Sequence, residues 1–329
     1  ILPVAGKGTR LRPQTLTRAK SLVQVAGATV LEHIIDRLAP LAATEYIFIT
    51  DDLGEQIRSF MTDRYPDLQC SYYLQHDRLG PAHAVLQAVP SIAEGDDVLV
   101  VFNDTIFITD LQNISALAAD CDGLIYSREV EDYQRFGVNV LDGDFIVDMV
   151  EKPDTPISRL AQVGLYYLKD AAALMRYLEA AVNAGETVKG EYYLPAVFMD
   201  MVAAGFKFRA PEIDSWLDCG KPETLLETNR QLLLETQQIH GEIIDSVIIP
   251  PVYIGPGTVI RHSVIGPFVT VAENCTIENT VIRDSIIHAD TSVKQSQLQH
   301  SLIGAHACVV GGSHTVNLGD YSQLLGVTD

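Results

Sequence analysis

Residues 4–13 read VAGKGTRLRP, and this stretch, with Lys20 shortly after it, decides how the first part of the chain folds. The residues that lead into it, ILPV at 1–4, are mostly apolar, so the pattern predicts a buried strand that ends in a glycine-rich loop. Gly6 and Gly8 allow positive φ angles and let a ligand approach main-chain N–H groups closely. The stretch therefore predicts a loop that binds phosphate.

The charge pattern indicates an anionic ligand at this loop. The protein has 329 residues and a formal net charge of −20, yet the only charged residues among the first twenty are the cations Lys7, Arg10, Arg12, Arg18 and Lys20. No GK[ST] closes the loop as in a Walker motif, and Arg10 and Leu11 stand where a dinucleotide fingerprint has its third glycine. A glycine turn with solvated charges remains the simpler alternative.

Composition excludes several other classes. A content of 43 acidic against 23 basic residues disfavours binding to nucleic acid or to an anionic membrane. We find no run of about 18 apolar residues and no leader pattern, so we expect no transmembrane helix, no signal peptide and a cytoplasmic location. The five cysteines lie far apart without CxxC spacing, which favours reduced thiols over disulfides or zinc.

Strand-like and helix-like runs alternate from residue 1 to about 230. The strand-like runs are 45–50, 70–75 and 97–104, and the helical ones are 29–41, 80–89, 170–185 and 222–238. This alternation predicts an α/β, Rossmann-like domain with a mostly parallel sheet over residues 1–238. Ligands of such sheets bind at the carboxyl ends of strands, where the glycine-rich loop and Asp104 are expected.

Residues 239–329 have a different pattern. Aliphatic residues recur there at intervals of five or six: Ile254, Ile260, Ile265, Val271, Ile277, Ile282, Ile287, Val293, Leu298, Ile303 and Val309. Hexapeptide repeats of this kind predict a left-handed parallel β-helix, of three to four coils if each takes about 18 residues. Sandwich strands are the alternative, but they are usually longer and separated by larger loops.

With these motifs in place, the chain resembles the sugar-1-phosphate nucleotidylyltransferases. Their signature, roughly GxGTRLxPxT and then PKxLxxV, corresponds to GKGTRLRPQT and AKSLVQV here, with Ala19 in place of the usual proline. Further motifs follow in the family's order: QHDRLGPAHAV at 75–85, FNDTIF at 102–107, FGV at 136–138, EKP at 151–153, VGLYY at 163–167, GEYYL at 190–194 and WLDCGKPE at 216–223. The long form of glucose-1-phosphate thymidylyltransferase is the most similar type, because it also carries a C-terminal β-helix. Family members usually have a few more residues in the first strand, so we expect residues before Ile1.

The resemblance implies a Mg²⁺-dependent attack of a sugar-1-phosphate oxygen on the α-phosphorus of dTTP or UTP, with glucose-1-phosphate as the expected sugar and pyrophosphate as the second product. Such catalysis depends on positioning and charge neutralisation. By motif position, Arg10 would stabilise the leaving pyrophosphate, Lys20 the α-phosphate and Lys152 the sugar phosphate. Asp104 and Asp218 would bind the metal, since carboxylates with phosphate oxygens and water suit magnesium. Asn103 replaces the glycine that usually precedes the first of these aspartates.

The resemblance also implies the remaining contacts. Gly6, Gly8, Thr9 and Arg10 would bind the nucleotide, and Gln75 with Gly80 would recognise its base. A glutamine amide can both donate to and accept from a pyrimidine edge, which favours uracil or thymine. Sugar contacts would come from Gly137, Glu151 and Tyr166 beside Lys152, although Glu151 and Lys152 could instead form only a structural ion pair.

Three alternatives remain. GEYYL also occurs in N-acetylglucosamine-1-phosphate uridylyltransferases. A non-catalytic regulatory subunit that binds sugar nucleotides could keep the same fold. Hexapeptide β-helices also build acetyltransferases, and this one contains His262, His288, His300, His306 and His314; however, it looks too short for that activity, so we expect it to serve homo-oligomerisation, regulation or structure.

Overall fold

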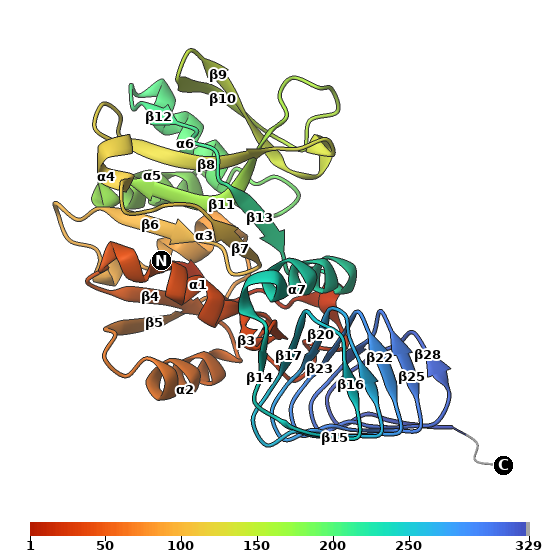
Figure 1. Ribbon diagram of the computed structural model, residues 1–329. Coiled ribbons are helices and arrows are strands. Elements are labelled where there is room, and N and C mark those ends of the chain that lie inside the picture. The colour runs from red at the N-terminus through yellow and green to blue at the C-terminus, as the bar shows by residue number, and fades with distance from the viewer. Residues whose placement is uncertain (327–329) are drawn as a thin grey trace. The chain divides into compact units, whose positions relative to one another are not determined.

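The computed structural model describes residues 1–326, which form two compact units (Figure 1). Unit 1 comprises Ile1–Gly6 and Ile34–Trp216. Unit 2 comprises Lys7–His33 and the chain from Leu217 onward. The segment with most of the glycine-rich loop thus belongs to the same unit as the C-terminal repeats.

Unit 1 has a parallel core. β1 pairs in parallel with β4, with Leu2 opposite Phe48, and β4 pairs in parallel with β5. The N-terminal amine of Ile1 donates to Leu99 O at 2.7 Å and Val101 N donates to Ile1 O at 2.9 Å, which joins β1 to β6. These strands are β1 (Leu2–Pro3), β4 (Tyr46–Thr50), β5 (Cys70–Leu74) and β6 (Val98–Val101). The parallel core predicted from the strand and helix alternation is confirmed.

Beyond β6 the strand directions become mixed. β11 is antiparallel to both β6 and β8, and β10 is antiparallel to β9 and β12. The strands are β8 (Gly123–Glu129), β9 (Gly137–Asp142), β10 (Phe145–Glu151), β11 (Leu160–Leu168) and β12 (Phe208–Arg209), and β7 (Thr105–Ile108) pairs with β13 (Ser215–Asp218). Only two residues connect β9 to β10, so this connection forms a hairpin and not a helical crossover.

The helices of unit 1 share one core with the sheet. Side chains of α3, α5 and α6 pack with those of β4, β6 and β11 in a single buried cluster. The helices are α2 (Gly54–Arg64), α3 (Pro81–Leu86), α4 (Ile114–Leu117), α5 (Ala171–Ala184) and α6 (Leu194–Ala203), and α1 (Val30–Leu38) begins in unit 2 and ends in unit 1. α5 begins where Asp170 accepts a hydrogen bond from Ala173 N and ends at Gly185, whose φ is +73°. Short 3₁₀ turns follow α1 at Ala39–Leu41 and α3 at Val89–Ser91, and another lies between β8 and β9 at Tyr133–Arg135.

Most of unit 2 is a parallel β-helix (Figure 1). Its three sheets contain six, six and five strands, in which each strand pairs in parallel with its equivalent in the next coil. The first sheet consists of β14 (Gln238–Ile239), β17 (Val252–Ile254), β20 (Val269–Val271), β23 (Ser285–Ile287), β26 (Leu302–Ile303) and β29 (Asn317–Leu318). The second consists of β15 (Glu242–Ile244), β18 (Val259–Arg261), β21 (Thr276–Glu278), β24 (Ser292–Lys294), β27 (Cys308–Val310) and β30 (Gln323–Leu325). The third consists of β16 (Val247–Ile248), β19 (Val264–Ile265), β22 (Val281–Arg283), β25 (Gln297–Gln299) and β28 (Ser313–His314).

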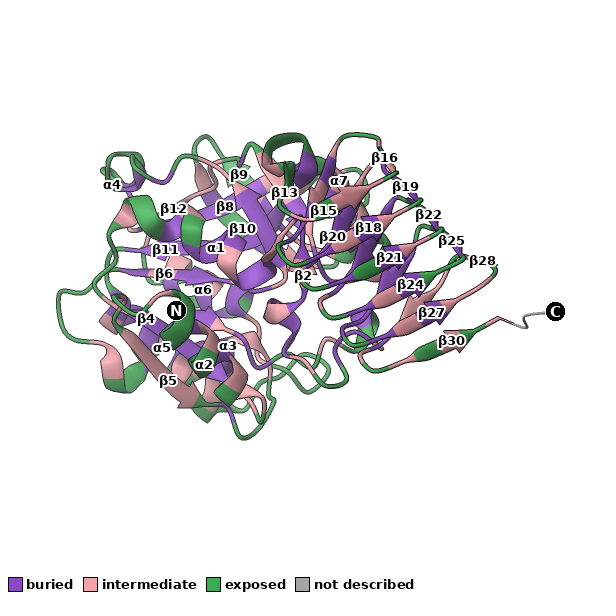
Figure 2. Ribbon diagram, turned by 60° about the horizontal axis from the view of Figure 1, so that its bottom comes forward, coloured by how far each residue is buried: buried purple, intermediate pink, exposed green. Residues whose placement is uncertain are grey.

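The hexapeptide pattern predicts the interior of this β-helix correctly. All eleven aliphatic residues named above are buried in one cluster. Figure 2 shows the same repetition as buried segments on successive strands. The prediction of three to four coils is wrong, because the described chain forms about six. Equivalent residues of the second sheet lie 17 residues apart in the first coils and 15 in the last, fewer than the 18 assumed, and the strands begin at Gln238.

The rest of unit 2 consists of α7 (Pro222–Thr236) and the segment Lys7–His33. That segment contains the 3₁₀ turns Thr9–Leu11 and Lys20–Leu22 and the hairpin β2 (Gln24–Val25) and β3 (Ala28–Thr29). Among the described helices, none is long and apolar enough to cross a membrane.

Candidate active site

The glycine-rich loop is a tight turn with a buried side and an exposed side. Gly8 adopts a left-handed conformation with φ +58° and starts the 3₁₀ turn Thr9–Leu11. Its carbonyl accepts from Leu11 N at 2.9 Å and from Thr15 Oγ1 at 2.8 Å. Leu11 and Thr15 are buried, whereas Thr9, Arg10 and Arg12 are exposed. The turn therefore presents two guanidinium groups to solvent from a fixed backbone.

Lys20 and the two glycines differ in what surrounds them. Lys20 is only 8% exposed, and a Cβ built on Gly8 would lie 3.2 Å from Lys20 Cβ, so the lysine stem packs on the turn. A Cβ built on Gly6 would meet nothing within 4 Å, and its φ is not in the left-handed region. The backbone of the protein thus requires a glycine at position 8 but not at position 6. A ligand that approaches the main chain closely would explain why a glycine occupies position 6.

Arg10 and Asp218, 208 residues apart in the sequence, meet at Gly220 in unit 2. Asp218 Oδ1 accepts from Gly220 N at 2.7 Å, and a Cβ built on Gly220 would lie 2.8 Å from this oxygen and 3.6 Å from Arg10 Nη2. Thr228 of α7 donates to the main-chain oxygen of Asp218 at 3.1 Å. A predicted phosphate ligand and a predicted metal ligand therefore lie side by side, over a glycine that leaves room between them.

Asp104 lies in unit 1, in the turn between β6 and β7, and is half-buried. Asn103 before it is 7% exposed, and its Nδ2 has no hydrogen-bond partner among the described residues. Asn103 does not have a positive φ, so this turn does not need the glycine that the family usually has there. The difference from the family therefore affects the side chain beside Asp104 more than the course of the backbone.

Gln75 and Gly80 are held together in unit 1. Gln75 is buried, and its Nε2 donates to Gly80 O at 3.2 Å and lies 3.2 Å from His83 Nδ1. Gly80 has φ +101°, and a Cβ on it would lie 2.7 Å from Tyr192 O. The glycine is thus required both by its backbone conformation and by the close approach of another main-chain segment. The Gln75 Nε2 already donates to Gly80 O and contacts His83 Nδ1, which leaves its Oε1 as the group best able to meet a base.

Four predicted sugar-site residues lie around the end of β10. Glu151 is opposite Gly137 in the β9–β10 hairpin, and a Cβ on Gly137 would lie 2.9 Å from Glu151 Oε2. Lys152 Nζ lies 3.0 Å from Glu151 Oε1, so the ion pair considered for these residues is present. Burial, followed by the carboxylates of Glu151 and Asp104, raises the pKa of Tyr166, so that hydroxyl stays protonated near these acids.

Two further residues at this place are absent from the predicted site. Lys152 Nζ lies 5.8 Å from the centre of the Tyr193 ring, and Tyr193 donates to Glu191 Oε2 at 2.8 Å. Gln162 is buried beside Gly137 and donates to Asn139 Oδ1 at 2.8 Å. Tyr193 belongs to the GEYYL motif, so the motif could have indicated it. Gln162 is the one amide side chain of β11, a strand that is otherwise mostly apolar. Its position there was the only signal that the sequence offered for it.

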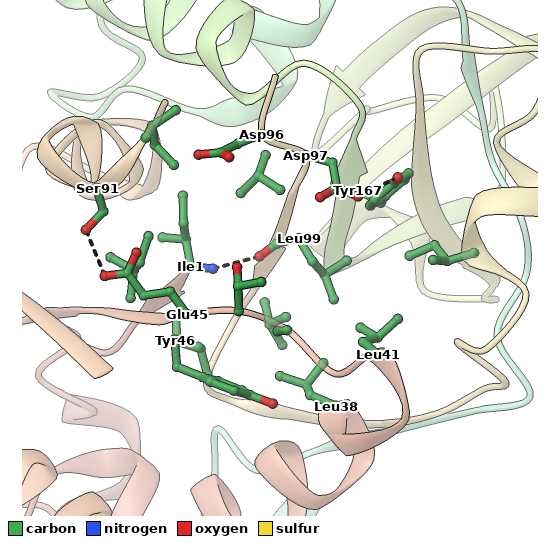
Figure 3. Close-up of a pocket in the computed structure, with 18 of the residues that line it drawn as sticks. Ile1, Leu38, Leu41, Glu45, Tyr46, Ser91, Asp96, Asp97, Leu99 and Tyr167 are labelled. Atoms are coloured by element: carbon green, nitrogen blue, oxygen red, sulfur yellow. Dashed lines mark hydrogen bonds between the residues drawn. The ribbon is translucent and has the colours of Figure 1, made fainter. Parts of the chain in front are cut away.

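A cavity of about 310 Å³ in unit 1 is not this site (Figure 3). It lies at the amino ends of β1, β4 and β6, where the N-terminal amine of Ile1 donates to Leu99 O and Ser91 donates to Glu45. None of the predicted site residues lines it. Parallel sheets bind ligands at the carboxyl ends of their strands, so its position also argues against a catalytic role.

The residues present fit a hard cation only in part. Asp104 and Asp218 offer carboxylate oxygens, the ligands that Mg²⁺ prefers. Within residues 1–326, no cluster of three or more His, Cys, Asp or Glu could hold a metal alone. A cation at either aspartate would need phosphate oxygens and water as its other ligands, as is common for Mg²⁺ bound with a nucleotide.

A parallel α/β core, a glycine-rich cationic loop and a C-terminal β-helix together define a nucleotidyltransferase of the type that carries a β-helix. The family model described as "Nucleotidyl transferase" matches residues 1–235, and the chain belongs to this family. The resemblance to sugar-1-phosphate nucleotidylyltransferases inferred from the motifs is thereby confirmed.

One relative extends this similarity over nearly the whole chain, and others match about 70% of it. "Glucose-1-phosphate thymidylyltransferase" of Streptomyces antibioticus is 30% identical, and the match covers 97% of each chain. "UTP--glucose-1-phosphate uridylyltransferase AglF" of Haloferax volcanii is 31% identical over 72% of this chain and 98% of its own. The solved structure of apo UDP-glucose pyrophosphorylase has the same fold, with a TM-score of 0.63 at 20% identity, over 71% of this chain and 97% of its own.

Proposed function

We propose that this protein transfers a nucleoside monophosphate from dTTP or UTP to a sugar-1-phosphate, with glucose-1-phosphate as the preferred acceptor, in a Mg²⁺-dependent reaction. A relative of 30% identity that matches 97% of the chain, β-helix included, is named glucose-1-phosphate thymidylyltransferase, which favours dTTP. We further propose that the protein acts in the cytoplasm as a homo-oligomer.

The meeting of Arg10 and Asp218 at Gly220 carries this proposal. In the proposed reaction, an oxygen of the sugar-1-phosphate attacks the α-phosphorus, and the bond to the bridging oxygen breaks to release pyrophosphate. The exposed Arg10 would neutralise the leaving pyrophosphate, and Lys20 would bind the α-phosphate. Magnesium, held by Asp104 and Asp218, would neutralise phosphate charge. Negative charge shifts to the leaving group in the transition state. Fixed positive charges that interact most strongly at that point lower the barrier more than they strengthen ground-state binding.

The groups of unit 1 would bind the base and the sugar. Gln75 Oε1 would accept from N3–H of thymine or uracil, and Gly80 would supply main-chain contacts. Lys152 would pair with the sugar phosphate, and Glu151 would accept hydrogen bonds from sugar hydroxyls. Thymine and uracil differ by one methyl group, a difference of about 1–3 kcal/mol, so either triphosphate fits this set of contacts.

Pyrophosphate release tests the proposal. ATP, CTP, GTP, UTP and dTTP are each combined with glucose-1-phosphate, N-acetylglucosamine-1-phosphate and mannose-1-phosphate, with Mg²⁺ or with EDTA. We expect release with dTTP or UTP and one sugar, and none with EDTA. Asp104→Asn should abolish turnover while the thermal unfolding midpoint stays unchanged. Preference for N-acetylglucosamine-1-phosphate would replace the proposed acceptor, and no release with any pair would favour a non-catalytic protein.

A further inference from the structure

The segment after the glycine-rich loop, Pro13–Gly27, lies along the first sheet of the β-helix within unit 2. Its contacts reach from the first coils to the last. A Cβ built on Gly27 would collide with the ring of Tyr253 on β17, and Gln24 Oε1 is 3.5 Å from Nδ1 of His288, directly after β23. Gln14 reaches β26 and β29. The phosphate-binding loop is thus continuous with a strap that is fixed to the β-helix.

Gln14 forms the best satisfied of these contacts. Its side chain is 2% exposed, and Nε2 donates to Leu318 O at 2.7 Å, with Asn317 Oδ1 at 3.0 Å and Leu302 O at 3.4 Å. Asn317 Nδ2 in turn donates to Arg12 O at 3.3 Å. The main chain next to the exposed Arg10 is therefore tied to the two last strands of the first sheet.

Asp320 provides a second contact on the same side of the β-helix. Its Oδ2 accepts from Thr17 Oγ1 at 3.0 Å and pairs with Arg18 Nη2 at 3.4 Å, while Oδ1 accepts from Ala305 N at 2.8 Å. The Asp320 side chain is 8% exposed, a burial that a carboxylate tolerates only with such partners. Thr17 and Arg18 lie three and two residues before Lys20, so this contact fixes the other end of the loop.

We propose that the β-helix positions the phosphate-binding loop, and that Gln14 and Asp320 are the positioning residues which hold Arg10 and Lys20 in place for the triphosphate. This inference rests on the proposed function. Gln14 lies four residues after Arg10, and the Asp320 contacts lie two to three residues before Lys20. Ordering a loop that carries exposed cations costs conformational entropy and so opposes binding, and a displacement of about 1 Å can slow a reaction about 100-fold.

The proposal predicts different effects on the binding of the two substrates. The residues proposed to bind the sugar-1-phosphate, Lys152 at its phosphate and Glu151 at its hydroxyls, belong to unit 1, whereas the strap and the loop belong to unit 2. A loop that loses its support should therefore bind the triphosphate less well and leave sugar-phosphate binding unchanged. Loss of a purely structural contact would lower stability and would reduce the concentration of active enzyme without changing either KM.

The experiment compares Gln14→Leu and Asp320→Asn with Gln297→Leu in the full-length protein. Gln297 is exposed on β25 and has no contact with the strap among the interactions described above, so it is the matched control for Gln14. We expect KM for the triphosphate to rise at least about tenfold in the first two variants, with KM for the sugar-1-phosphate unchanged within about twofold. Hydrogen–deuterium exchange of peptides that span residues 8–20, measured without substrate, should become faster.

The outcomes distinguish this inference from the proposed function. If the wild type is active and both variants keep its KM values and its exchange rates, the β-helix does not position the loop. Equal increases in both KM values would also overturn the inference. If the wild type releases no pyrophosphate with any substrate pair, the proposed function fails, and the exchange experiment still decides whether the β-helix orders the loop.

Discussion

Lys152 Nζ lies 3.0 Å from Oε1 of Glu151, its neighbour in the sequence. Consecutive side chains of a strand point to opposite faces, so two adjacent residues can pair only where the chain leaves the extended conformation. β10 ends at Glu151, and Lys152 has φ +48°, which brings the two side chains together. The ion pair thus forms because the strand ends at Glu151. The ammonium group of Lys152 stays half-exposed beside Tyr193.

Replacing Lys152 by Met should therefore weaken sugar-phosphate binding. Charge-assisted hydrogen bonds contribute about 1.5–3 kcal/mol, so kcat/KM for the sugar-1-phosphate should fall about 10- to 100-fold. Lys294→Met is the control, because Lys294 pairs with Glu278 at 3.6 Å with nearly the same side-chain exposure, 47% against 49%. Steady-state kinetics with both substrates varied will measure the effect. Equal losses in the two variants would contradict a role for Lys152 in binding.

Two buried asparagines should differ in their importance for stability. Asn139 is fully buried, its Nδ2 donates to Ser127 Oγ at 2.8 Å, and its Oδ1 accepts from Gln162. Asn139→Ala should lower the free energy of unfolding by about 2–3 kcal/mol, because it leaves buried partners unsatisfied. Asn103→Ala should lower it by less than about 1 kcal/mol, since Asn103 Nδ2 has no partner among residues 1–326. Urea denaturation will compare them, and a larger loss at Asn103 would contradict this reading.

Gly80 should be less replaceable than Gly205, a glycine with nearly the same φ angle. Gly80 and Gly205 have φ angles of +101° and +102°, but a Cβ on Gly80 would meet Tyr192 O at 2.7 Å, whereas one on Gly205 would meet nothing within 4 Å. Gly205→Ala measures the strain of a positive φ angle without a steric clash, about 1–2 kcal/mol. Gly80→Ala should lose more stability, and the thermal unfolding midpoint will show the difference. Equal midpoints would mean that the segment at Tyr192 moves freely.

Stability should decrease in acid because of His288. Burial, and then the charge of Arg18, lower the pKa of His288 from 6.5 to about 3, while Asp320 opposes the shift. The folded protein therefore keeps this imidazole neutral, and the unfolded chain takes up a proton as the pH falls below about 6.5. Between pH 6 and 4 this histidine should lower stability by about 1.4 kcal/mol per pH unit.

His288→Gln should remove this part of the pH dependence. The control is His300→Gln, since His300 is exposed. Urea denaturation at pH 7, 6, 5 and 4 will compare the two variants with the wild type. If the His288→Gln protein has the same slope as the wild type, the acid sensitivity arises from other groups.

Local patterns predicted the parts of the fold that depend on local periodicity. The spacing of Ile254, Ile260 and Ile265 correctly predicted interior positions of the β-helix, and the apolar runs at 45–50 and 70–75 correctly predicted β4 and β5. Local patterns contain little information about contacts between distant segments. Nothing near Gln14 indicates that it bonds to Leu318, and nothing near β11 indicates that it is antiparallel to both of its main neighbours.

The same limit applies to the candidate site. Motif positions supplied Arg10 and Asp218, and the structure brings these two together at Gly220. The motif positions could not indicate that the Gln75 amide already donates to Gly80 and contacts His83, because these contacts depend on the side-chain conformations in the folded protein.

The strap also limits how many coils the β-helix can have between its two points of attachment. Gly27 is fixed at β17 and Gln14 at β29, and four intervals of the sheet, at about 4.8 Å each, separate these strands. Inserting or deleting one coil between them would shift one attachment by a full interval and detach either Gln14 or Gly27. Coils could be gained or lost only before β17 or after β29. The spacing of the two ends of a short N-terminal segment therefore determines how many coils this protein can have between them.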